Sequence, residues 1–334
     1  GCGLDMAALN EPVIIVVPFT EWNDWVLDCV RHCAKLAFQD FVLWLLPNEL
    51  PSPEWAGRLA GTGIGARVHV RPTGPGNPAR KRNVAMRESG GRIFALIDSD
   101  AYPRADWLSN ALPLLNDEVT IVTGPNVSPP EDPVSRQAAS HVMESRVGFY
   151  AGYIRHVPRT RRLVGEMPTC NMIFARQDGL FFHEELDTSE DMVFCRETAA
   201  RGKRILYDPG VVVFHHRREI FRPFMKQFFN YGLDKGRLFR AGRPGPNLRH
   251  AAPVLFILYL LSIPALFAAR LAAGAGAGWH WLYLAPLFCY LALVAFESIR
   301  LSSSAREIAP TCLAFVAAHL SFGYGAIKGF ACRR

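Results

Sequence analysis

Short apolar runs that end at polar residues or prolines dominate the first two thirds of the chain. Val13–Val17 and Phe41–Leu46 stop at a proline, and Ile93–Ile97 runs into an aspartate. Unbroken runs of this length are typical of strands buried on both faces of a parallel sheet. Between them, apolar residues recur at helical spacing over 24–37 and about 79–87. This order of strands and helices predicts an α/β domain with a mainly parallel sheet.

Shorter elements are predicted further along. Strands are expected at 68–70, 119–123, 171–175, 205–207 and 211–214, and helices at 106–115, 134–150 and 190–201. Thr188 and Ser189 are good N-cap residues for the last of these helices. Residues 152–168 contain four arginines and are predicted to form a loop that acts as a lid over an acceptor.

The last third of the chain has a different pattern. Residues 253–269 and 271–296 contain no Asp, Glu, Lys or Arg, and neither do residues 308–327. The last segment contains His319, whose protonation state the sequence leaves open. A bilayer core of about 30 Å requires about 20 apolar residues. A buried core helix is the alternative for any one segment, but three in succession predict two to three transmembrane helices within 250–334, with a turn at 272–278.

Charge is distributed unevenly along the chain. Residues 1–216 contain 22 Lys and Arg against 26 Asp and Glu, whereas 217–249 contain 9 against 2. A basic segment beside apolar helices indicates the anionic cytoplasmic face of a membrane. Nucleic-acid binding is not expected, because the basic residues do not spread over the globular part. The predicted domains are therefore a catalytic domain at 1–216, a basic interfacial segment at 217–249 and a membrane region at 250–334.

The basic segment also has an amphipathic pattern. Phe221, Phe224, Met225, Phe228 and Phe229 follow helical spacing, with basic residues between them. This pattern indicates a helix at the membrane interface, which would bring membrane lipids and a lipid-linked acceptor close. The alternative is a core helix of the catalytic domain.

Cysteine usage indicates the cellular compartment. None of the eight cysteines forms a Cys-x-x-Cys pair, and we interpret them as reduced, cytosolic residues. Residues 1–12 have no apolar core typical of a signal peptide. We predict a multi-pass protein of the plasma (inner) membrane with its catalytic domain in the cytoplasm.

Two acidic residues follow the strand predicted at 93–97. In an extended chain Asp98 and Asp100 lie on the same side. Ligands of open α/β sheets bind at the carboxyl ends of the strands. Two acids there can hold a divalent metal and, through it, a diphosphate. The alternative is an Asp-rich turn that caps the following element.

A second acidic pair, Glu190-Asp191, opens the helix predicted at 190–201. The positive end of the helix favours the ionised carboxylates, although acids in a first turn are also common in ordinary helices. Downstream, His215 ends a predicted strand. A histidine there can be a metal ligand, a proton carrier or a polar strand end.

The ordered set of motifs resembles the family 2 glycosyltransferases over roughly residues 12–240. The segments that carry this resemblance are Val13–Pro18, Arg82-Asn83, Asp98-Ser99-Asp100, Asn171-Met172, Glu190-Asp191 and Val213–His215. The resemblance implies a GT-A fold, the Rossmann-like fold of nucleotide-diphospho-sugar transferases, followed here by transmembrane helices. It also implies inverting transfer of a sugar with Mg²⁺ or Mn²⁺ as cofactor.

The resemblance assigns roles to individual residues. Asp98 would lie near the nucleoside, Asp100 would bind the metal and His215 would be a second metal ligand. Asp191 would be the general base, with Glu190 beside it. The other residues expected to contact donor are Pro18, Asn48, Arg82, Asn83 and Ser99, and those expected to contact acceptor are Asn171, Gln227 and Tyr231. Arg80 and Lys81 could assist the donor phosphates, or lie on a solvated helix face.

Two departures from the family pattern refine the prediction. Many relatives carry an acidic pair after the second strand, where this chain has Pro47-Asn48-Glu49. The Asn48 side chain can still hydrogen-bond a base edge. Processive members carry a Gln-x-x-Arg-Trp motif, whereas residues 227–231 end in Asn-Tyr. We therefore expect one sugar to be added per encounter.

Together these features predict a membrane-anchored, metal-dependent glycosyltransferase. Its donor would be a nucleotide-diphosphate sugar, and its acceptor a lipid-linked hydroxyl in cell-envelope or exopolysaccharide glycan synthesis. The alternatives are a processive polysaccharide synthase and a non-catalytic membrane scaffold that binds glycolipid. A nucleotidyltransferase would leave the 190–191 pair and the membrane anchor without a role.

Overall fold

The computed structural model describes residues 11–186, 189–242, 248–272 and 280–332. The chain divides into two compact units. The first, here called the sheet unit, comprises the described residues up to Pro129 together with Ile154–His216. The second, the helical unit, comprises Pro130–Tyr153 and the described residues from Arg217 onward.

An eight-stranded sheet forms the centre of the sheet unit. Its strands are β1 (Val13–Pro18), β2 (Phe41–Leu46), β3 (Val68–Val70), β4 (Ile93–Leu96), β6 (Val119–Thr123), β8 (Arg162–Val164), β9 (Met172–Ala175) and β10 (Arg204–Tyr207). They lie in the order β3-β2-β1-β4-β9-β6-β10-β8. Strand β9 runs antiparallel to both of its neighbours and β8 runs antiparallel to β10, whereas the other pairs are parallel. The predicted α/β fold with a mainly parallel sheet is confirmed.

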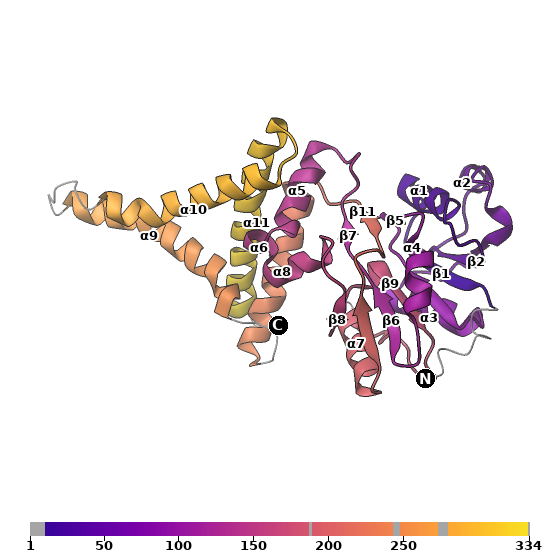
Figure 1. Ribbon diagram of the computed structural model, residues 1–334. Helices are drawn as coiled ribbons and strands as arrows, with labels where there is room; N and C mark the ends of the chain where they lie inside the picture. Colours follow the sequence, from indigo (N-terminus) through magenta and orange to yellow (C-terminus); the bar gives the residue numbers. More distant parts are fainter. Residues whose placement is uncertain (1–10, 187–188, 243–247, 273–279, 333–334) are drawn as a thin grey trace. The chain divides into compact units, whose positions relative to one another are not determined.

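Helices cover both faces of this sheet (Figure 1). Alternate residues of β1 enter different cores: Ile15 packs in one together with α1 (Asp24–Cys33) and α4 (Trp107–Ala111). Ile14 packs in the other, with α3 (Pro78–Glu88) and α7 (Glu190–Ala200). Every residue of β1 is buried. The two covered faces are the physical reason for the unbroken apolar runs in the sequence. The remaining helix of this unit is α2 (Pro53–Ala60).

Several predicted boundaries differ from the structure. The helix expected at 24–37 ends at Cys33, and the one expected at 106–115 ends at Ala111 and continues as the 3₁₀ turn Leu112–Leu114. The helix expected at 134–150 is broken at Ser145, whose backbone is extended, into α5 (Val134–Glu144) and α6 (Arg146–Phe149).

The prediction that 152–168 is a loop was wrong in part. Residues 162–164 form β8 at the edge of the sheet. The hydroxyl of Tyr207 donates to the carbonyl of Val157 at 2.9 Å and accepts from the N–H of Arg159 at 3.2 Å. These bonds anchor the segment before β8 to the sheet. The sequence of β8 contains no apolar run that would predict a strand, because two of its three residues are exposed.

A second, three-stranded sheet was also not predicted. It contains β5 (Ala101–Pro103), β11 (Val213–His215) and β7 (Asn126–Val127), with β11 in the middle. Strands β5 and β11 are antiparallel, and His215 pairs with Ala101. This register joins the chain directly after the 98–100 acids to the end of β11.

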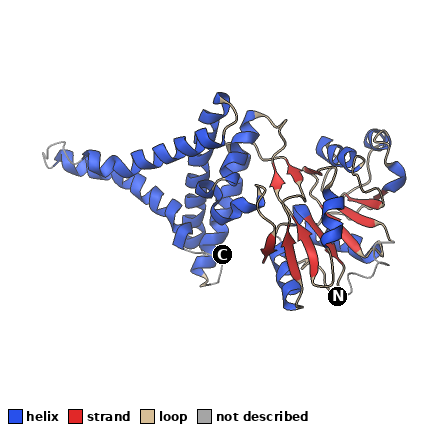
Figure 2. Ribbon diagram, in the orientation of Figure 1, coloured by secondary structure: helices blue, strands red, loops and turns tan. Residues whose placement is uncertain are grey.

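The described part of the helical unit contains no strand (Figure 2). Besides α5 and α6 it contains α8 (Arg222–Arg240), α9 (Ala252–Ala272), α10 (His280–Leu301) and α11 (Ala305–Ala331). Helices α8 and α11 pack through glycines spaced four residues apart on each: Gly232 and Gly236, Gly325 and Gly329. A Cβ atom at any of these four would lie 2.0–2.2 Å from a backbone oxygen of the other helix. Small residues at this spacing allow helix backbones to approach closely.

Three helical segments are long and apolar enough to span a membrane. They are Arg249–Ala272, Trp281–Leu301 and Ala305–Ala331, and the most apolar 18-residue windows in them have mean hydropathies of 2.2, 1.8 and 1.3, respectively. In the first segment no residue of this window is buried, whereas in the third segment 39% of the window is buried. Helix α10 begins at His280, after the turn expected at 272–278. Most of the turn expected at 272–278 falls in 273–279, outside the described residues.

Candidate active site

The acids after β4 lie on a turn at the carboxyl edge of the sheet. The N–H of Ile97 still bonds the carbonyl of Val16 in β1 at 3.2 Å, and the N–H of Ala101 then bonds the carbonyl of Asp98 at 3.1 Å. Asp98 and Asp100 therefore occupy a tight turn rather than the extended chain that we had expected. Ser99 lies between them in the turn, and all three residues are partly exposed.

The small sheet brings His215 to this turn. The Nε2 atom of His215 lies 3.1 Å from Oδ1 of Asp100. The next residue, His216, donates its N–H to the carbonyl of Asp100 at 3.0 Å. Strand β11 thus joins Asp100 through both backbone and side chain, across 115 positions of sequence.

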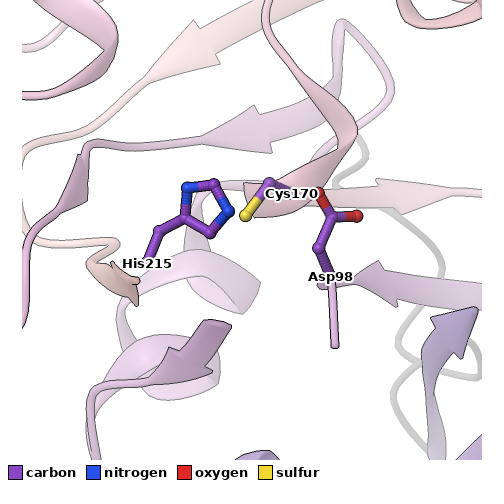
Figure 3. A group of neighbouring side chains, drawn as sticks. All are labelled: Asp98, Cys170 and His215. Carbon is purple, nitrogen blue, oxygen red and sulfur yellow. The ribbon is translucent and has the colours of Figure 1, made fainter. Parts of the chain in front are cut away.

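Cys170 is a neighbour that sequence reasoning missed. One ligand atom from each of Asp98, Cys170 and His215 lies within 4.8 Å of the others (Figure 3). The only sequence signal is its place directly before Asn171, because no second cysteine stands at a metal-ligand spacing. Carboxylates suit Mg²⁺ and Mn²⁺, and the imidazole and thiol extend the donor set toward softer metals. With Asp100 beside this cluster, the residues present fit a divalent cation.

Arg82 links the two acidic pairs. Its side chain is 3% exposed, and its guanidinium contacts Asp98 Oδ1 at 3.2 Å and Glu190 Oε1 at 2.9 Å. Burial raises the pKa of Asp98; the Arg82 guanidinium opposes this shift and the nearby Asp100 adds to it. The position of Arg82 between two carboxylates explains how residues of α3, β4 and α7 form one site.

Asp191 lies in the first turn of α7. Its Oδ1 accepts the N–H of Met192 at 2.7 Å. Burial raises the pKa of Asp191, and the neighbouring Glu190 raises it further. Ser189 precedes the helix with a left-handed φ of 69° and makes no capping hydrogen bond through its side chain. Ser189 therefore occupies the predicted N-cap position without a capping bond from its side chain, and Thr188 lies outside the described residues.

Two predicted ligand-binding asparagines are completely buried. Asn83 accepts the N–H of Phe182 at 2.9 Å and donates to Glu184 Oε1 at 2.9 Å. Asn171 accepts from the indole N–H of Trp107 at 2.8 Å and donates to the carbonyl of Val211 at 2.8 Å. Both amides therefore hold protein segments together, and their roles toward donor and acceptor remain predictions.

The remaining predicted donor residues of the sheet unit lie at the ends of β1 and β2. Pro18 is the buried last residue of β1. Asn48 follows β2, and its N–H donates to the carbonyl of Thr20 at 3.3 Å. Lys81 does not lie on a solvated helix face: it is 2% exposed, and its ammonium donates to Asn48 Oδ1 at 2.8 Å.

The predicted acceptor residues Gln227 and Tyr231 belong to the helical unit. They lie one turn apart on α8, and the Gln227 amide donates to the Tyr231 hydroxyl at 2.9 Å. Tyr231 is 37% exposed. Their contact with an acceptor stays a prediction.

Comparison with known proteins identifies the class. Residues 13–177 match the family described as "Glycosyl transferase family 2". This range contains β1, β4, the 98–100 turn and β9. The chain is a family 2 glycosyltransferase with a GT-A fold, followed by three long apolar helices.

Individual relatives are distant. A dolichyl N-acetyl-alpha-D-glucosaminyl phosphate 3-beta-D-2,3-diacetamido-2,3-dideoxy-beta-D-glucuronosyltransferase from Methanococcus voltae is 23% identical over 257 residues, which cover 74% of this chain and 73% of that protein. A pre-mycofactocin glycosyltransferase from Mycobacterium tuberculosis is 26% identical over 161 residues, which cover 46% of this chain and 33% of that protein.

Among solved structures, the mannosyltransferase PcManGT from Pyrobaculum calidifontis, in complex with GDP-Man and Mn²⁺, is similar in fold. The TM-score is 0.54 at 21% sequence identity, over 96% of this chain and 88% of that one. At this identity the likeness extends to the fold, including the helices that follow the sheet.

Proposed function

We propose that the protein is an inverting glycosyltransferase that moves a sugar from a nucleotide-diphosphate donor to a hydroxyl of a lipid-linked acceptor. The observation that carries the proposal is the gathering of Asp98, Asp100 and His215 at the carboxyl edge of β4. The Arg82 ion pairs connect this group to the helix that carries Asp191. One edge of the sheet thus holds a donor-binding group and a base.

The donor binds at the 98–100 turn. Asp98 lies toward the nucleoside, and Asp100 and His215 are the residues that would hold Mg²⁺ or Mn²⁺. A divalent cation held there would supply positive charge to neutralise the leaving diphosphate. Asp100 is fixed from both sides, because His215 contacts its side chain and His216 its carbonyl.

Asp191 takes the proton from the acceptor hydroxyl. Its Oδ1 is engaged by the Met192 N–H, so Oδ2 is the oxygen that accepts the proton. A raised pKa makes the Asp191 carboxylate a stronger base than an ordinary aspartate carboxylate. As the proton moves to Oδ2, the acceptor oxygen forms a bond to the anomeric carbon from the opposite side to the diphosphate. The carbon–oxygen bond to the diphosphate breaks, and the anomeric configuration inverts.

The three apolar spans support a membrane-bound acceptor. We place the sheet unit in the cytoplasm, at the inner membrane, because nine basic residues lie within 217–249 and positive residues favour the cytoplasmic side. The Methanococcus relative acts, by its name, on a dolichyl-phosphate-linked sugar. A polyprenyl-linked acceptor in cell-envelope or exopolysaccharide synthesis follows by analogy.

The proposed reaction adds one sugar per encounter, because residues 227–231 lack the Arg-Trp pair of processive enzymes. A processive polysaccharide synthase would instead produce ladders from a defined acceptor. A non-catalytic scaffold would bind glycolipid and turn over no donor. Product length and donor turnover therefore separate the three possibilities.

The test is a panel of nucleotide sugars incubated with the full chain purified in detergent. We expect one donor to be hydrolysed slowly without acceptor, with the activity lost in EDTA and in Asp100→Ala. Asp178→Ala, an aspartate remote from the turn, should retain it. Binding of a donor without turnover would leave the scaffold as the better account, and no binding of any donor by folded protein would refute the donor site itself.

A further inference from the structure

A buried lysine beside the proposed donor site has no acidic partner. Lys81, on α3, is 2% exposed. Its ammonium donates to Asn48 Oδ1 and Thr73 Oγ1, both at 2.8 Å, and to the carbonyl of Leu46 at 3.2 Å. The carbonyl of Gly74 is a fourth acceptor, at 3.4 Å. All four acceptors are neutral, and among the described residues no carboxylate forms an ion pair with Lys81. Burial lowers its pKa to about 8, so the ammonium is still charged at pH 7.

The lysine fixes the polarity of the Asn48 amide. An ammonium has three donors and no acceptor. The oxygen of Asn48 must therefore face Lys81, and the NH₂ group must face the other way. This assignment does not depend on the usual ambiguity of asparagine side chains, because the reversed amide would set NH₂ against NH₃⁺.

Asn48 itself is held firmly in place. Its N–H bonds the carbonyl of Thr20 after β1 at 3.3 Å, and its carbonyl accepts the N–H of Gly74 at 3.1 Å. Thr73 also bonds the carbonyl of Pro47 through its N–H at 2.9 Å. Three loops thus meet at Asn48. Since the backbone cannot turn and the amide cannot flip, the direction of its two N–H donors is fixed.

The position of Asn48 suits the base of a nucleotide. Strand β1 lies between β2 and β4, so Asn48 and Asp98 stand at the same edge, two strand spacings or about 10 Å apart. A nucleoside diphosphate reaches across such a separation, with its base near β2 and its phosphates near β4.

We propose that Lys81 is a specificity-determining residue, which makes Asn48 a pure hydrogen-bond donor toward the nucleotide base. The site then selects bases with a carbonyl oxygen at position 4 of a pyrimidine or position 6 of a purine over those with an amino group there. This inference rests on the proposed function, since it needs the nucleotide to bind at this edge. An amino group facing the Asn48 donors would leave them unpaired, which costs binding free energy.

The experiment compares matched nucleoside diphosphates by calorimetry at pH 7 with Mn²⁺. UDP is compared with CDP, and IDP with ADP. Within each pair the nucleotides differ only in the carbonyl or amino group at position 4 or 6 and in the protonation of the adjacent ring nitrogen. For the full chain in detergent we expect the better of the two carbonyl-bearing nucleotides to bind at least about 10-fold more tightly than its amino partner. Lys81→Met frees the amide to rotate and should reduce this ratio to about 2-fold or less.

Two controls make the result decisive. Lys203→Met changes a lysine that precedes β10, at the opposite edge of the sheet, and should preserve the ratio. Asn48→Ala removes the amide at a partly exposed loop position while leaving Lys81 in place, and it should also abolish discrimination even if Lys81→Met does not fold. Equal binding of partners by the unaltered protein, or discrimination that survives in folded Lys81→Met or Asn48→Ala, would overturn the inference alone. Failure of every nucleotide to bind would overturn it together with the donor site.

Discussion

The sheet unit and the helical unit treat apolar residues in opposite ways. In the sheet unit every residue of β1 and β4 is buried between two layers of helices. In the helical unit, the most apolar 18-residue window of the segment that contains α9 has a mean hydropathy of 2.2, yet none of this window is buried. Leu255 and Leu261 are 62% and 66% exposed. The protein supplies an apolar environment for its sheet, whereas the described residues leave α9 exposed, and this helix is long and apolar enough to span a membrane.

Polar residues follow the reverse pattern. The sheet unit gathers its acids at a partly exposed edge, where Asp100 remains 39% exposed. The helical unit buries polar contacts between helices: the Ser145 hydroxyl donates to Glu297 in α10 at 2.7 Å, and Glu297 also pairs with Arg300 at 2.7 Å. The acids at the edge of the sheet unit are therefore accessible to a ligand, whereas the bond between Ser145 and Glu297 serves to join helices.

The largest effect is expected from removing the base. Asp191→Asn keeps the size of the side chain and the bond from Met192, but the neutral amide cannot take a proton. Transfer to a lipid-linked acceptor should fall by about 10²–10⁴-fold, measured by product formation at saturating donor. Donor affinity should stay within about 2-fold, because the proposed donor contacts lie elsewhere. Equal losses of donor affinity and rate would show that Asp191 acts in binding instead.

The next effect concerns stability of the sheet unit. Arg82→Gln leaves Asp98 and Glu190 without the buried cation between them, and removing one partner of a buried ion pair typically costs about 3–5 kcal/mol. Thermal unfolding should occur at a clearly lower temperature. The control is Arg87→Gln on the same helix, whose ion pair with Glu184 is 53% and 35% exposed and should contribute less than about 1 kcal/mol. Similar losses for the two variants would mean that the buried bridge has no special structural role.

The central strands and the contacts at the candidate site differ in how far the sequence alone could predict them. Unbroken apolar runs were sufficient for β1, β2 and β4, because double burial requires them. The apolar pattern predicted a strand at 211–214 but not the three-residue strand β5 that pairs with β11, so only the family resemblance implied that Asp100 and His215 lie together. Cys170 was missed, and the burial of Lys81 was not predicted, for a related reason: contacts between segments distant in sequence determine their surroundings.

The corresponding change in the helical unit is Gly236→Leu. A Cβ at Gly236 would lie 2.2 Å from the carbonyl oxygen of Ala326, which belongs to helix backbone and cannot rotate away. The added side chain should separate α8 from α11 and destabilise the unit by about 1–3 kcal/mol, measured by thermal loss of helix signal in detergent. Nucleotide binding by the sheet unit should persist at temperatures where this loss begins.

Gly57→Ala supplies the matched control for that substitution. Gly57 lies within α2, and a Cβ there would meet nothing within 4 Å. Alanine in a helix interior is favoured over glycine by about 0.5–1 kcal/mol, so this variant should be slightly more stable. A loss of stability in Gly57→Ala would contradict the open space described around Gly57 in α2. No loss in Gly236→Leu would contradict the close packing of α8 against α11.

The smallest effect tests whether the edge of the sheet unit is built for chemistry at the expense of stability. Burial raises the pKa of Asp191, so its ionised form destabilises the native state at neutral pH. Between the unfolded and the raised native pKa the native state binds more protons, and this group's contribution to stability increases as pH falls. Asp191→Asn removes the charge and should therefore raise the free energy of unfolding at pH 7 by about 0.5–2 kcal/mol. The difference from the unaltered protein should shrink as the pH of the denaturant titration is lowered toward the ordinary aspartate pKa. A variant that loses activity and also unfolds more easily at pH 7 would show that Asp191 stabilises the start of α7, and its rate loss could then no longer be assigned to the missing base.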